Sequence, residues 1–142
     1  MATSNAATTY TEHAILQFLF KNNSESFASP GDNIYVGLAT AVSSAEGGSV
    51  TEANFTNYAR VQKAASTWTV PSVSTDAQVA TTTLIEFPAS GGGGDDTITH
   101  VFIASASSSG NIYFIGALDA NKTIGSGDIF RINAGNLSVE LK

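Results

Sequence analysis

Glu46 and Glu52 are the two residues whose type and spacing come closest to supporting acid–base chemistry. Both lie in residues 40–56, a polar stretch with glycines that predicts a long connection, with a helical turn around residues 51–55. Cleavage of a glycosidic bond requires two carboxyl groups about 5 to 9.5 Å apart in a cleft, so this pair would serve a small hydrolase. It is the enzymatic alternative that the residues offer.

The other reactive residue types are scarce and are not spaced as a site. The sequence has no cysteine, one methionine and two histidines, and neither His13 nor His100 has a neighbour at metal-ligand spacing. Asp95 and Asp96 follow the glycines at 91–94 and could offer oxygen ligands to Ca²⁺, but the alternating acidic pattern of an EF-hand loop is missing. We therefore predict a protein that is not an enzyme, with no catalytic residue, metal or cofactor, and leave an ion at Asp95 and Asp96 open.

Arg60 and Trp68 are candidates for structural or interface contacts. Arg60 follows Tyr58 closely, and its planar guanidinium suits a bidentate pair with a carboxylate, either buried or at an interface. The spacing is equally compatible with an arginine on an edge strand that faces water. Trp68 is either a core residue, which we favour, or an interface residue.

A helix is predicted from Tyr10 to about Lys21. Thr9 and Glu12 fit a capping box, and Lys21-Asn22-Asn23 is a stop signal. Its apolar residues occupy most of the circumference, so the helix needs two covers, of which one is its own β core and the second a loop or another subunit. The expected interface residues are Ile15, Phe18, Leu19, Tyr58, Arg60 and Trp68.

The rest of the sequence predicts short strands separated by Ser, Thr, Asn and Gly. The expected strands are 34–39, 58–62, 68–73, 82–87, 98–104, 112–118, 129–132 and 137–141. The fifth and sixth should form a hairpin that is apolar on both faces, and the last two a second hairpin. The fold class is mainly β: an antiparallel β-sandwich or flattened barrel of about eight strands with one N-terminal helix.

Composition limits the domain organisation and the partners. We expect a flexible N-terminal arm at residues 1–9 and a single β-rich domain, with its helix, at residues 10–142. The net charge of -6 repels phosphate backbones and anionic lipids, so neither nucleic acid nor membrane is an expected partner. We predict no signal peptide and no transmembrane span, because the longest apolar run is far below about 20 residues.

The order of several short motifs resembles a group of small tailed-bacteriophage virion proteins, which are labelled tail fibre-like or head decoration proteins. The motifs are Ala14-Ile15-Leu16, Phe20-Lys21, Tyr35-Val36-Gly37-Leu38, Asn57-Tyr58-Ala59-Arg60, Phe87-Pro88, Gly116-Ala117-Leu118 and Gly127-Asp128. They span nearly the whole chain. The resemblance implies a non-enzymatic structural component on the surface of the virion, assembled in the host cytoplasm.

Within that group the sequence favours a capsid decoration, or cement, protein. A fibre needs a shaft, and the chain has no repeat to build one, whereas a cement protein needs a compact body, an arm and apolar surface. The expected partner is the major capsid protein, which residues 1–9 and 40–56 would reach, with the chain in homo-oligomers such as trimers. The alternative is a tail, baseplate or tail fibre-like protein for host attachment, with tail proteins or a host receptor as partner.

Overall fold

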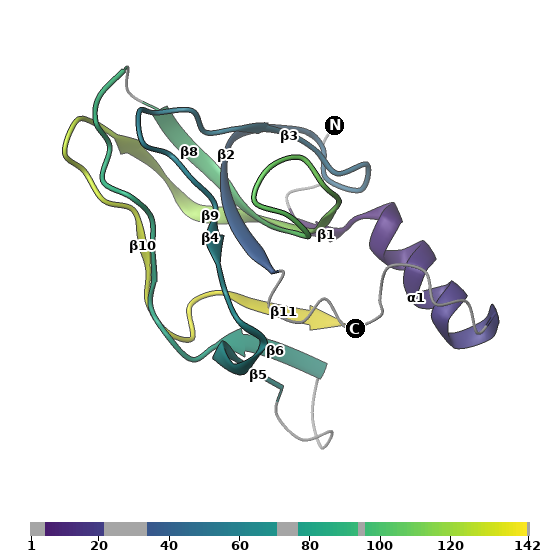
Figure 1. The fold of residues 1–142 in the computed structure, drawn as a ribbon. Coiled ribbons are helices and arrows are strands. Elements are labelled where there is room, and N and C mark those ends of the chain that lie inside the picture. Colours follow the sequence, from purple (N-terminus) through teal and green to yellow (C-terminus); the bar gives the residue numbers. More distant parts are fainter. Residues whose placement is uncertain (1–4, 22–33, 71–76, 94–95, 142) are drawn as a thin grey trace.

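The computed structural model describes residues 5–21, 34–70, 77–93 and 96–141, which are mainly β (Figure 1). The helical elements are α1 (Thr9–Lys21) and the short 3₁₀ helix η1 (Ala65–Thr67). The strands are β1 (Asn5–Ala7), β2 (Tyr35–Ser44), β3 (Ser49–Glu52), β4 (Val61–Gln62), β5 (Trp68–Thr69), β6 (Ala77–Thr81), β7 (Ile85–Glu86), β8 (Asp96–Ala104), β9 (Ile112–Ile124), β10 (Arg131–Ile132) and β11 (Ser138–Leu141). The predicted fold class is confirmed, although many strands are shorter than predicted.

The largest sheet is antiparallel and has the order β1-β9-β8-β2-β3, with β4 also paired to β2. Its centre is the β8–β9 hairpin, which the sequence predicts correctly and whose two strands extend further than expected at the end away from the connecting loop. We call these six strands the main sheet. Because β8 and β9 both lie between other strands, apolar residues on both of their faces are buried within the chain.

The predicted strand at 82–87 is reduced to β7, and the predicted hairpin between 129–132 and 137–141 is wrong. Instead, β7 pairs with β10 and β6 with β11, so that residues 77–86 and 131–141 run antiparallel with a bend near Thr81. The bend is held by hydrogen bonds from Thr81 N–H to the Leu137 carbonyl and from Gly135 N–H to the Thr81 carbonyl. This long-range pairing buries Ile85, which a local hairpin would have left without its partner strand.

The long connection predicted at residues 40–56 is largely a hairpin. Strand β2 continues to Ser44 and turns at residues 45–48 into β3, and no helical turn forms at 51–55. The strand signal was weak because β3 is a polar edge strand, and exposed polar residues are common on sheet edges. The strand predicted at 58–62 is reduced to β4, and β5 is the described part of the one predicted at 68–73.

Helix α1 begins directly after β1, which pairs with β9. The capping residue is Thr8 rather than Thr9, because the Thr8 hydroxyl accepts the Thr11 N–H at 3.3 Å. Residues 5–7 of the predicted arm therefore belong to the sheet, and Thr8 caps the helix. Residues 1–4 lie outside the described part, and the proposed domain division stays a prediction. At 13 residues, α1 is too short to span a bilayer.

Buried side chains form two clusters, one on each face of the main sheet. Alternate residues of β2 separate them: Val36 and Leu38 belong to one cluster, and Ala39 with Phe102 to the other. The first cluster is completed by aromatic residues in ring contact, Phe55, Tyr58, Phe87 and Phe130. In the second, the Phe102 ring lies over Gly37, where a side chain would collide with it.

We predict that Gly37→Ala lowers the free energy of unfolding by about 1 to 3 kcal/mol, because the new Cβ would displace the buried Phe102 ring. Chemical denaturation followed by circular dichroism measures the change. The control is Ala41→Val on the exposed side of the same strand, which should change stability by no more than about 0.5 kcal/mol. Equal effects of the two substitutions would contradict the close packing of Phe102 on Gly37.

Candidate functional site

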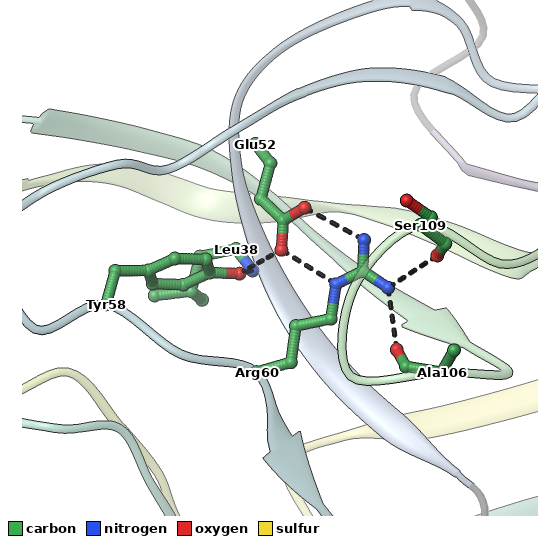
Figure 2. A network of polar contacts seen from close by, with 6 residues as sticks. All are labelled: Leu38, Glu52, Tyr58, Arg60, Ala106 and Ser109. Atoms are coloured by element: carbon green, nitrogen blue, oxygen red, sulfur yellow. Dashed lines mark hydrogen bonds and ion pairs between the residues drawn. The ribbon is translucent and has the colours of Figure 1, made fainter.

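The Arg60 side chain is the centre of the most connected polar network of the described residues (Figure 2). Its Nε and Nη2 donate to the two carboxylate oxygens of Glu52, each at 2.8 Å. The Arg60 side chain is only 5% exposed and that of Glu52 is 31% exposed. Of the two arrangements that the sequence allowed, the bidentate carboxylate pair is the one present, and it forms within the chain.

Tyr58 contacts the Arg60–Glu52 pair from the side of the core. Its hydroxyl donates to Glu52 Oε1 at 2.7 Å and accepts the Leu38 backbone N–H at 3.0 Å (Figure 2). Burial raises the pKa of Tyr58 above its ordinary value, and the hydrogen bond to the Glu52 carboxylate raises it further. The hydrogen bond to Glu52 likewise raises the pKa of Arg60, so the guanidinium remains charged at neutral pH.

The other edge of the guanidinium holds the loop that joins β8 to β9. Arg60 Nη1 donates to the carbonyl oxygens of Ala106 at 2.7 Å and Ser109 at 2.9 Å. Ser109 has a positive φ of 53°, which is unusual for a residue with a side chain. The plane of the guanidinium lies over Phe102, 5.0 Å from the ring centroid, so the same residue contacts the loop and the core.

A polar cleft of about 570 Å³ opens beside this network. It lies between the start of α1, the β2–β3 turn and the β8–β9 loop, and its lining includes Tyr10, Glu46, Glu52, Arg60 and Asn111. The two carboxylates singled out from the sequence therefore line one cleft. Both oxygens of Glu52 are already hydrogen-bonded to Arg60 or Tyr58, which gives this carboxylate a structural role.

An ion site at Asp95 and Asp96, which the sequence left open, cannot be tested with the described residues. Asp95 lies outside them, and Asp96 Oδ2 accepts the backbone N–H groups of Asn54 at 2.7 Å and Phe55 at 2.9 Å. Where the chain is described, no three His, Cys, Asp or Glu side chains gather as metal ligands would. Asp96 thus holds the chain between β3 and Tyr58 in place.

Helix α1 carries the other predicted interface residues, and it projects away from the sheets (Figure 1). Thr11 and Ala14 are buried and Ile15 is half-buried, whereas Phe18 and Leu19 are among four large apolar residues that are 56% to 77% exposed. Their role in an interface stays a prediction. The structure does not bring them together with Tyr58 and Arg60, whose partners lie within the chain.

Trp68 lies apart from both groups, at the margin of the first core cluster. It is half-buried, and its indole N–H has no hydrogen-bond acceptor among the described residues. The sequence did not identify Glu52 as the partner of Arg60, because the two are joined only when β3 forms. A strand pattern in residues 49–52, with alternating exposure, was the available signal.

Comparison with known proteins gives one finding for nearly the whole chain. A family model described as Gp80, podophage GP4 fiber I protein gp80, matches residues 6–140. The matched range covers α1, the Arg60 network and all of the strands apart from Asn5, at the start of β1, and Leu141, at the end of β11. No curated protein matches the sequence.

We predict that Glu52→Ala lowers the free energy of unfolding by about 2 to 4 kcal/mol, because it leaves the nearly buried Arg60 guanidinium without its counter-ion. The matched control is Glu86→Ala, which breaks the Arg131–Glu86 pair, whose side chains are both about half exposed. That change should cost no more than about 1 kcal/mol. Chemical denaturation compares them, and losses of equal size would contradict the central role of Arg60.

We also predict that stability falls as the pH rises above about 10, the ordinary tyrosine pKa. The folded state retains the Tyr58 proton while the unfolded state releases it, so unfolding is favoured by up to about 1.4 kcal/mol per pH unit. Unfolding midpoints between pH 8 and 11 measure this slope. Tyr58→Phe should flatten it and Tyr35→Phe should not; an unchanged slope in Tyr58→Phe would contradict the prediction.

Proposed function

The chain belongs to the family of the podophage GP4 fiber I protein gp80, and we propose that it is a non-enzymatic structural subunit of a bacteriophage fibre. Membership confirms the resemblance to tail fibre-like proteins of small tailed phages and makes the chain a virion structural protein. The position in the fibre, the partners and the absence of catalysis belong to the proposal.

The observation that carries the proposal is the exposed apolar surface of α1. Isolated helices of this length are marginally stable in water, and only the first turn and a half of α1 packs on its own sheet. A subunit whose helix is completed by a neighbour gains stability on assembly. This requirement suits a structural protein present in contact with other virion subunits.

A non-enzymatic role is supported by the contacts of Glu46 and Glu52, the two residues with carboxylates that could have served catalysis. Glu52, one of the two carboxylates in the polar cleft, is held by Arg60 and Tyr58. Glu46 remains exposed at the β2–β3 turn, and its backbone carbonyl accepts the Thr9 N–H at 2.7 Å. The backbone of Glu46 therefore helps to hold the start of α1 against the β2–β3 turn.

Capsid decoration is the second candidate, because a compact β body with a protruding apolar helix also suits a protein that clamps major capsid subunits. The description of the matched family favours the fibre over the head. In either position we propose that the chain forms homo-oligomers on the particle surface. Attachment to a host receptor would be a property of the fibre and would use its exposed end.

We predict that cryo-electron microscopy of intact particles, compared with particles lacking the protein, will show its density in fibres and not across the head. Deletion should leave the heads intact and reduce adsorption to host cells, because fibres are the appendages that contact the host. Density repeating over the head lattice, with fragile heads after deletion, would replace the fibre proposal with capsid decoration. Particles with neither difference would overturn both.

A further inference from the structure

The far end of α1 is an apolar surface without a cover in the described chain. We call Leu16, Phe18, Leu19 and Phe20 the α1 tip; each is more than half exposed. With roughly 200 Å² for each aromatic side chain, Phe18 and Phe20 alone present about 270 Å². The complete tip therefore reaches the size of the largest apolar patch on a typical monomer, about 300 to 600 Å², which is often functional.

The same chain contains an apolar cavity of about 320 Å³ between the main sheet and the β5-β6-β11 sheet. Its lining is Ile34, Ala65, Trp68, Val70, Val79, Ile103, Tyr113, Phe114 and Val139. None of these side chains carries a charge, and Val70 is exposed. The cavity thus suits an apolar occupant with the size of one or two large side chains.

The α1 tip does not line this cavity in its own chain, where contacts at the base of α1 fix the start of the helix on the sheet. There the Thr8 N–H and the Thr11 hydroxyl donate to the Tyr113 carbonyl at 3.0 and 2.9 Å, and the Thr8 hydroxyl donates to the Ile112 carbonyl. Phe18 lies about 10 Å farther along the helix axis than Thr11. No residue of α1 lines the cavity.

We propose that the α1 tip of one copy of the chain occupies the apolar cavity of a second copy. Every copy carries both surfaces in equal number, so each contact can be repeated. The two surfaces match in polarity: the four residues of the tip are apolar, and no charged residue lines the cavity. The inference rests on the proposed function in so far as a fibre is built from several copies.

The arrangement determines the kind of assembly. Tip and cavity are different surfaces, so the contact is head-to-tail and generates a closed ring or, if it does not close, a filament. A tip of roughly 450 Å² that covers a similar area on its partner buries about 900 Å², below the roughly 1,000 Å² of a specific interface, so a single contact is weak. In a ring each copy makes two such contacts, and closure adds to their stability.

Crosslinking tests the contact directly, because the natural chain has no cysteine. We predict that Leu19→Cys and Val79→Cys variants of the full chain, co-expressed and mildly oxidised, form a disulfide-linked heterodimer. Replacing Val79→Cys with Lys122→Cys, on an exposed part of β9, should reduce the yield at least tenfold. Equal yields, or a crosslink that forms only within a chain carrying both Leu19→Cys and Val79→Cys, would overturn the proposal.

The single tryptophan provides a second readout, since Trp68 lines the cavity. Phe18→Asp with Leu19→Asp should weaken self-association by at least about 100-fold and shift Trp68 emission to longer wavelength. The control is Leu84→Asp, an exposed apolar residue away from α1 and the cavity. Sedimentation and fluorescence of purified protein measure both effects; a monomeric wild type, or unchanged association in the double variant, would overturn the proposal.

These outcomes are separable from those of the proposed function. Loss of self-association in purified protein says nothing of position in the particle, which microscopy of virions establishes independently. A chain that is found in fibres but does not self-associate through α1 would overturn this inference and leave the proposed function standing.

Discussion

The nearly complete burial of one guanidinium is the constraint on which the rest of the fold depends. A charge removed from water must be neutralised and hydrogen-bonded, because an unpaired buried ion costs several kcal/mol. Arg60 meets this requirement with Glu52 on β3 and two carbonyls of the β8–β9 loop, while Tyr58 joins Glu52 to β2. The pair therefore ties these segments together in a protein with few other charges.

The polar and apolar requirements of the chain are met in different ways. Buried polar groups around Arg60 find partners within the chain, and Asp96 accepts two backbone N–H groups. The apolar α1 tip and the cavity near Trp68 do not find such partners in the described residues. A body whose buried charges are paired internally while part of its apolar surface stays exposed resembles a subunit that assembles with others.

The elements that the sequence predicts well are those whose signals are local. Continuous apolar patterns identify β8 and β9, and apolar residues between cap and stop signals identify α1. The errors fall at residues 40–56, where a polar local hairpin replaces the predicted connection, and at residues 82–87 and 129–141, where short segments become strands because distant segments pair with them. Prediction of the Arg60 ion pair was limited in the same way. The bidentate geometry follows from the residue type, but the identity of the partner, Glu52, depends on the formation of β3.

The attachment of α1 has a mechanical consequence. The helix is joined to the start of β9 by Thr8 and Thr11, where β1 also lies along that strand. A force applied to α1 therefore enters the sheet at its central hairpin, next to the loop that Arg60 holds. An appendage built through α1 would transmit tension from this hairpin through the helix to the cavity of the next copy, whose walls include β5, β6 and β11.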